Sequence, residues 1–246
     1  MKIDVVPVNS QYSKCLVLVG GSGDTSDGLV PLTTKLIGKL TETSICTFSF
    51  TPYSSEESVL DVQSRELEQV IKQLIADYKF DEISLFSTSM GAYATIKILS
   101  VKKYSGLIKK VILFDPADYY LSAKFGDSSD VTWSGSQAYE PTKEVVSNEL
   151  KNLSGKVKIS VVHLTLRNYG ASGYLQEDYR ARGVDDPNGY PRLSTTMVKG
   201  LYDKVPLTNR EEYVELLGVP HAILRDGNIP MNIESVAGTI VDIIDK

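Results

Sequence analysis

Short apolar runs and longer amphipathic stretches alternate along the chain. The short runs have the length of buried strands and predict strands at residues 2–8, 14–19, 44–50, 81–86, 110–115, 157–166 and 212–218. The longer stretches repeat apolar residues every three or four positions and predict helices at residues 28–40, 57–78, 91–103, 141–153, 193–205 and 231–244. This alternation predicts one α/β domain over residues 1–246, with a mostly parallel, doubly wound sheet and helices on both faces.

Two segments interrupt the alternation. Residues 116–140 are rich in Tyr, Asp, Ser and Gly, and residues 168–192 are rich in Gly, Tyr and charge. Both are longer than ordinary connections, which favours lids or binding loops. In the first segment, Tyr119, Tyr120 and Trp133 are candidates to line a covered pocket, although buried aromatic residues are as often plain core.

Composition narrows the function. Hydrophobic residues make up 42% and charged residues 23%, as in ordinary globular proteins, and the formal charge of −5 does not favour a nucleic-acid partner. Two Cys and two His, widely spaced, do not fit a zinc finger. The longest apolar run, residues 15–19, is far shorter than a membrane span, and the first residues lack the apolar core of a signal peptide. We therefore expect a cytoplasmic protein with reduced thiols, no membrane span and no cofactor.

The most informative stretch joins a strand to a helix through Ser87-Thr88-Ser89-Met90-Gly91. This context is that of the G-x-S-x-G nucleophile elbow, with Ser89 as the nucleophile. The backbone before and after a strained central residue passes close by, so the flanking positions need small residues. Ser87 replaces the usual first Gly. The alternative is a loop whose hydroxyl groups cap the following helix.

A glycine-rich turn, residues 20–24, follows the strand at residues 14–19. It lacks the Lys of the phosphate-binding loop, and Ser26 stands where the third Gly of the dinucleotide pattern belongs. A turn at this place can instead direct backbone N–H groups at a developing oxyanion. Ser22 and Met90 would then supply the two N–H donors. The alternative is a plain turn whose glycines adopt positive φ.

A serine nucleophile needs a base within hydrogen-bond distance, and the chain offers His163 and His221. His163 lies inside an apolar strand and reads as a core residue. His221 lies in a loop between the last strand and the last helix, where open α/β sheets carry their chemistry. The sequence favours His221 as the base, with a turn or helix-cap histidine as the alternative.

In chain order, the strand with its glycine turn, the elbow at Ser89 and the late His221 resemble the α/β-hydrolase family, and this resemblance covers nearly the whole chain. It implies a serine hydrolase that acts on an ester, thioester or amide, with a Ser–His–acid triad. Gly20 stands where the family often has His. The first strands of the family are trimmed here, since residues 2–8 leave room for only one strand ahead of the strand at residues 14–19.

The triad acid is left open. In most of the family the triad acid follows the strand that corresponds to residues 157–166. Here residues 166–170, at the end of that strand, contain no carboxylate. Asp115, in a Leu-Phe-Asp-Pro-Ala context, resembles the acid of pancreatic-type lipases, although many relatives carry a noncatalytic Asp-Pro turn here. The other candidates are Asp178, Asp185, Asp186 and Asp203.

Three function classes follow from these residues. The first is a serine hydrolase for small to medium acyl esters, with Ser89, His221 and either Asp115 or Asp186 as the triad and with Ser22 and Met90 at the oxyanion. The second is a protein of the same fold that binds a ligand or partner without catalysis. The third, a nucleotide-binding protein, lacks the required motifs. The expected partner is a small ester-type molecule.

Overall fold

The computed structural model covers a chain of 246 residues. It describes residues 3–6, 13–21, 26–48, 50, 59–104, 106–116, 148–153, 156–165, 195–217 and 230–246. Both expected lid segments, except residue 116, lie outside these ranges. Of the helix predicted at residues 141–153, only the end is described, and residues 148–151 are helical.

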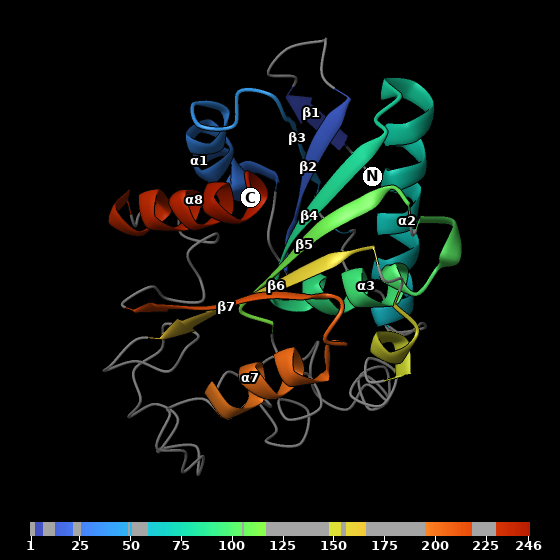
Figure 1. Cartoon of the computed structure of the whole chain (residues 1–246). Coiled ribbons are helices and arrows are strands. Elements are labelled where there is room, and N and C mark those ends of the chain that lie inside the picture. Colours follow the sequence, from blue (N-terminus) through green and yellow to red (C-terminus); the bar gives the residue numbers. More distant parts are fainter. Residues whose placement is uncertain are drawn as a thin grey trace.

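Within the described residues, one seven-stranded sheet forms the centre of the molecule (Figure 1). Its strands are β1 (Ile3–Val6), β2 (Lys14–Val19), β3 (Ser44–Phe48), β4 (Glu82–Thr88), β5 (Ile108–Phe114), β6 (Lys158–Thr165) and β7 (Arg210–Leu217). The order across the sheet is β1-β3-β2-β4-β5-β6-β7. β1 runs antiparallel to β3, and the other pairs are parallel. The mostly parallel sheet predicted from the sequence is confirmed.

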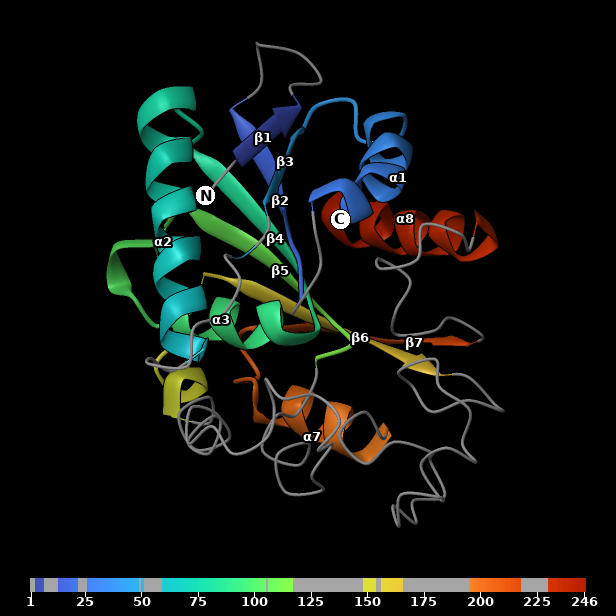
Figure 2. The ribbon, with the colours of Figure 1, turned by 180° about the vertical axis from the view of Figure 1, so that it is seen from behind.

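Helices cover both faces of this sheet (Figures 1 and 2). The described helices are α1 (Ser26–Ile37), α2 (Val59–Tyr78), α3 (Ser89–Leu99), the short 3-10 helix η1 (Lys102–Tyr104), α7 (Thr195–Lys204) and α8 (Pro230–Ile244). α1 and α8 lie side by side on one face, and α2, α3 and α7 lie on the other. The predicted arrangement with helices on both faces is therefore present.

Side-chain alternation along the strands divides the core into two layers. In β2, Cys15 and Val17 pack in the layer with α2 and α3, whereas Leu16 and Leu18 pack in the layer with α1 and α8. Because both faces are covered, the central strands are apolar without interruption rather than alternating with polar residues. Cys15 and Cys46 are buried free thiols within this core, and burial raises the pKa of Cys15. None of the described helices is long and apolar enough to cross a membrane.

The chain changes direction across the sheet around β2. β3 lies on one side of β2, and β4, which follows α2, lies on the other. The carboxyl ends of β2 and β4 therefore form a topological switch point, where open α/β sheets bind ligands. The glycine turn after β2 and Ser89 after β4 meet at this point.

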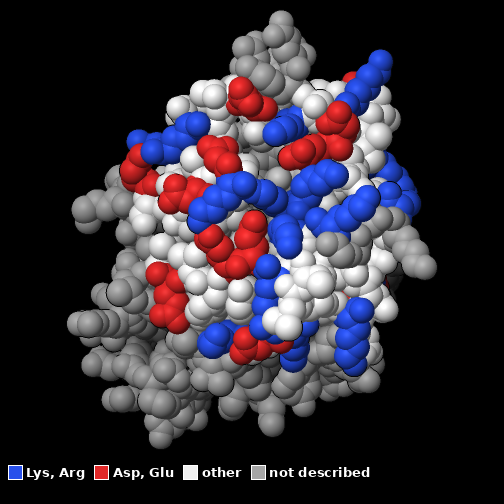
Figure 3. Space-filling view, in the orientation of Figure 1, with Lys and Arg blue, Asp and Glu red and all other residues white. Residues whose placement is uncertain are grey.

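Charged side chains of both signs occupy the face seen in Figure 3. A band of Lys and Arg side chains crosses it and is bordered by Asp and Glu side chains. Ion pairs such as Lys246 with Glu212 join the two signs on the surface. With acids and bases so closely mixed, charge alone identifies no ligand for this face.

Candidate active site

Ser89 occupies a strained position between a buried strand and a helix. β4 is buried from Ile83 onward, and Ser89 is the first residue of α3. Its φ is +46°, in the left-handed region that non-glycine residues rarely adopt. In the described part of the chain, the other non-glycine residues with positive φ are Lys79, after α2, and Asp115, directly after β5. Strain of this kind clusters at functional sites, and here two such residues follow neighbouring strands of one sheet.

Gly91 is required by a close contact with the turn after β2. A Cβ atom at Gly91 would lie 2.6 Å from the carbonyl oxygen of Gly20 and 3.0 Å from Cγ1 of Val19. The first of these atoms is backbone and cannot rotate away. The close approach expected from the elbow pattern is therefore present, and it brings α3 against the switch-point turn.

Ser87, the departure from the usual glycine, is accommodated in the core. Its side chain is fully buried, and its Oγ lies 2.6 Å from Oγ1 of Thr95 in α3. Each buried hydroxyl group thereby has a hydrogen-bond partner, which removes the cost of burying it. A serine at this position is thus compatible with the tight turn.

The N-terminus of α3 supplies backbone donors beside Ser89. Thr88 is the N-cap, and its side chain makes no cap hydrogen bond; its Oγ1 instead donates to the carbonyl of Val19 at 3.4 Å. The N–H of Met90 belongs to the first turn, where N–H groups have no acceptor within the helix. Such groups favour negative charge, and one of them is the donor that the sequence assigns to an oxyanion.

Asp115 and His163 form a buried pair next to this site. Asp115 is fully buried, and its Oδ1 lies 3.1 Å from Nδ1 of His163 and accepts the N–H of Leu164 at 3.1 Å. The N–H of Asp115 donates to the carbonyl of Val162 at 2.7 Å. His163 is a core histidine, as the sequence predicts, but its contact with Asp115 was not foreseen. The only signal in the sequence is a histidine within an otherwise apolar strand.

The strand register brings the ends of β4 and β5 and the carboxyl end of β6 together. Thr88 is opposite Phe114, and Phe114 is opposite Val162. The next position along these chains is Ser89 after β4, Asp115 after β5 and His163 in β6; His163 is in turn opposite Glu215 in β7. Ser89, Asp115 and His163 therefore lie on or directly after three neighbouring strands, toward the carboxyl end of the sheet.

The other site residues predicted from the sequence lie either outside the described ranges or away from Ser89. Ser22, His221, Asp178, Asp185 and Asp186 lie outside the described residues. Asp203 lies in the last turn of α7, where it is exposed and pairs with Lys199 and with Arg210 at the start of β7. Asp203 is therefore at the amino end of the sheet, opposite to Ser89, so its candidacy as triad acid is wrong. No group of three or more His, Cys, Asp and Glu residues within the described ranges is placed to hold a metal ion.

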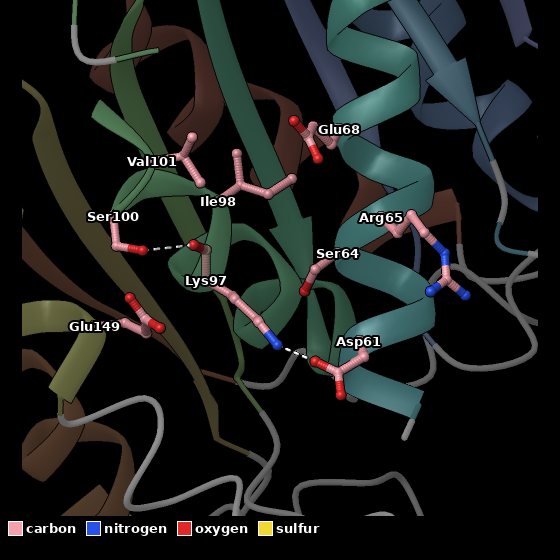
Figure 4. Close-up of a pocket in the computed structure, with 9 residues that line it drawn as sticks. All are labelled: Asp61, Ser64, Arg65, Glu68, Lys97, Ile98, Ser100, Val101 and Glu149. Atoms are coloured by element: carbon pink, nitrogen blue, oxygen red, sulfur yellow. Dashed lines mark hydrogen bonds and ion pairs between the residues drawn. The ribbon is translucent and has the colours of Figure 1, made fainter. Parts of the chain in front are cut away.

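A separate cavity of about 640 Å³ lies between α2 and α3 (Figure 4). Its lining consists of Asp61, Ser64, Arg65, Glu68, Lys97, Ile98, Ser100, Val101 and Glu149. None of these is a site residue predicted from the sequence. Lys97 of α3 pairs with Asp61 of α2 across it, and Glu68 pairs with Lys103 and Lys72. The Lys97–Asp61 pair joins α3 to α2, the Lys103–Glu68 pair joins η1 to α2, and the Lys72–Glu68 pair lies within α2. These contacts favour a structural role for this region.

Replacing Glu68 by Gln should destabilise the protein at pH 7 but not near pH 2. Hydrogen bonds from Lys103, then from Lys72 and Tyr104, lower the pKa of Glu68 to about 2. A carboxyl group with a depressed folded pKa stabilises above its unfolded pKa of about 4.3, and this contribution is lost as pH falls toward 2. Solvent screening limits the loss at pH 7 to about 1 kcal/mol.

Urea unfolding at several pH values measures this effect. Asp77→Asn is a matched control, because it removes one negative charge from the exposed last turn of the same helix, where a negative charge is unfavourable. A loss for Glu68→Gln that persists unchanged at pH 2 would contradict the ion-pair explanation.

Comparison with known proteins identifies the fold of this chain. No protein-family model and no curated protein matches the chain. Among solved structures, Est1E from Butyrivibrio proteoclasticus, also solved with ferulic acid bound, has a TM-score of 0.62 at 12% identity, covering 100% of this chain and 96% of that one. An esterase of Pyrococcus furiosus has a TM-score of 0.62 at 15% identity, covering 96% and 84%. A bromoperoxidase of Bacillus anthracis has a TM-score of 0.57 at 13% identity, covering 99% and 95%.

These neighbours have the α/β-hydrolase fold, and the likeness extends over nearly the full length of both chains. The parallel sheet, its helices on both faces and the strand-to-helix turn at Ser89 agree with that assignment. This chain is therefore a protein of the α/β-hydrolase fold.

Proposed function

We propose that this protein is a serine hydrolase that cleaves carboxylic esters through an acyl-enzyme on Ser89. One observation carries the proposal: Ser89, with φ at +46°, follows the buried strand β4 at the switch point of the sheet and begins α3. Such a turn presents the hydroxyl group at the edge of the sheet beside the N–H groups of a helix N-terminus. Several structural neighbours are esterases, which agrees with this reaction class.

In the proposed reaction, His221 takes the proton of the Ser89 hydroxyl as Oγ attacks the ester carbonyl carbon. The N–H groups of Met90 and Ser22 stabilise the oxyanion of the tetrahedral intermediate. His221 then returns the proton to the departing alcohol, which leaves the acyl group on Ser89. Water, deprotonated by His221, attacks the acyl-enzyme and releases the carboxylic acid and the free serine.

We propose Asp115 as the acid that orients His221 and stabilises its charged form. Its position directly after β5, the strand that pairs with β4, supports this choice, because Ser89 directly follows β4. Its complete burial supports it further, because a buried carboxylate acts on a neighbouring imidazole with little screening. Asp186, Asp185 and Asp178 are the competing candidates. Replacing each of the four in turn by Asn distinguishes them, since only loss of the acid reduces turnover severely.

The substrates we propose are esters with small to medium acyl groups. Est1E, a structural neighbour, has been solved with ferulic acid, but identity to it is only 12%. The aromatic residues Tyr119, Tyr120 and Trp133 are candidates for the pocket that selects the acyl group. A panel of aryl esters of increasing chain length measures this selectivity directly.

Labelling with a fluorophosphonate probe, followed by mass spectrometry of the labelled peptide, tests the nucleophile. We expect one label, on Ser89, and competition between the probe and the preferred ester. A protein that binds an ester-like ligand without turnover would instead leave Ser89 unlabelled and show no hydrolysis across the ester panel.

A further inference from the structure

We infer that His163 is a positioning residue of the active site: its buried imidazole holds the Asp115 carboxylate in place at the end of β5, the strand next to the one that Ser89 follows. This inference rests on the proposed function, in which Asp115 is the triad acid. His163 is only 1% exposed and lies within β6, so it is not placed to touch a substrate. Its effect on the reaction passes through Asp115.

The contact geometry fixes the carboxylate from the β6 side. Nδ1 of His163 lies 3.1 Å from Oδ1 of Asp115, and the N–H of Leu164 donates to the same oxygen at 3.1 Å. The proposed triad requires an ionised Asp115, and an ionised carboxylate only accepts hydrogen bonds, so this mechanism requires the His163 tautomer with the proton on Nδ1. Both donors belong to buried residues of a strand that pairs with β5 on one side and β7 on the other, so neither moves easily.

Burial makes this contact costly to lose. Asp115 is fully buried, and a buried carboxylate without hydrogen-bond donors is strongly destabilised. Asp115 also has φ at +44°, so the chain turns sharply at this residue. The hydrogen bond from its N–H to the carbonyl of Val162 fixes the backbone, and His163 fixes the side chain. Three successive residues of β6, Val162, His163 and Leu164, therefore hold Asp115 in place.

The neighbouring strand adds a second polar layer. Glu215 of β7 is the register partner of His163, and the hydroxyl group of Tyr213 donates to Oε1 of Glu215 at 3.3 Å. Burial, with further contributions from Glu215 and Asp115, raises the pKa of Tyr213. Tyr213 therefore remains neutral across the range of a pH–rate profile, and changes in such a profile do not arise from its ionisation.

The consequence is a specific kinetic signature. A triad acid acts by orienting the imidazole, and a misplacement of about 1 Å in such a group costs about a hundredfold in rate. Displacement of Asp115 should therefore lower kcat and leave KM nearly unchanged, because the substrate pocket keeps its contacts.

Three variants of His163 test the inference. Asn places its amide nitrogen near the position of Nδ1 and keeps the donor; Leu has nearly the same shape without it; Gln places its amide nitrogen farther out. We expect His163→Asn to keep kcat within about fivefold of wild type. We expect His163→Leu and His163→Gln to lose roughly 10- to 100-fold in kcat, with KM within twofold and with a shifted acid limb of the kcat pH profile.

The outcomes separate this inference from the proposed function. Equal kcat values and pH profiles for Asn and Gln variants that both fold, as judged by circular dichroism and thermal unfolding, overturn the role of His163, whether or not the Leu variant folds. Wild-type turnover in Asp115→Asn also overturns it, while probe labelling of Ser89 leaves the hydrolase proposal intact. Absence of labelling in the wild-type protein overturns the proposed function itself.

Discussion

Replacing Ser89 by Ala should reduce kcat/KM for esters about ten-thousand-fold or more and abolish fluorophosphonate labelling. The change removes the atom that forms the acyl-enzyme, and loss of a triad nucleophile has effects of this order or larger. A ten-thousand-fold loss corresponds to about 5.5 kcal/mol of transition-state stabilisation. The fold should persist, because Ser89 is only half-buried and Ala is close to Ser in size.

Two further variants control this prediction. Ser100→Ala alters a serine at the other end of α3, whose Oγ donates to the carbonyl of Lys97, and it should leave turnover unchanged. His221→Ala should reduce turnover to a similar degree as Ser89→Ala, since both act in one unit and their effects are not additive. Full activity in Ser89→Ala, with the protein still folded, would end the serine mechanism.

Gly91→Ala should destabilise the protein more than the same change at Gly200 or Gly238, the other helical glycines whose surroundings are known. The added Cβ would overlap the carbonyl oxygen of Gly20 at 2.6 Å, so either α3 or the turn after β2 must move. Overpacking of this kind typically costs about 1–3 kcal/mol, and more when the neighbour is rigid backbone. The same movement separates Ser89 from the turn that carries Ser22, so we also expect turnover to fall at least tenfold.

Gly238→Ala provides a control with the opposite sign. Gly238 lies inside α8, and a Cβ there meets nothing within 4 Å. Ala should therefore stabilise the protein by about 1 kcal/mol through helix propensity. Chemical unfolding of both variants, with ester turnover on the same samples, makes the comparison. If Gly91→Ala were as stable as wild type, the close contact between α3 and the β2 turn would be refuted.

The sequence predicted elements well where apolar residues are continuous. The strand predicted at residues 14–19 is β2 with the same bounds. The prediction for β5 was less accurate: it began at residue 110, whereas the strand begins at Ile108. Lys109 and Lys110 interrupt the apolar pattern there. The structure accommodates Lys110 in the strand because its Nζ donates to the carbonyls of Ile243 and Ile244 at the end of α8.

The helix after β4 shows a related limit. Its apolar pattern suggested a start at residue 91, but α3 begins at Ser89. The two residues before Gly91 carry little periodic signal, since their positions are set by the tight turn rather than by core packing. The motif at Ser87, Ser89 and Gly91 predicted that turn, and the contact between Gly91 and Gly20 supplies its physical reason.

The sequence by itself determined the α/β class, the elements and the strained turn at Ser89, because periodicity and small residues act over a few positions. The tertiary structure decided the strand order, the antiparallel direction of β1 and the removal of Asp203 from the candidates for the acid. It alone brought Asp115 to His163, which lie 48 residues apart in the chain. That contact depends on the register between β5 and β6, and register is fixed only when whole strands pair and both faces of the sheet are buried.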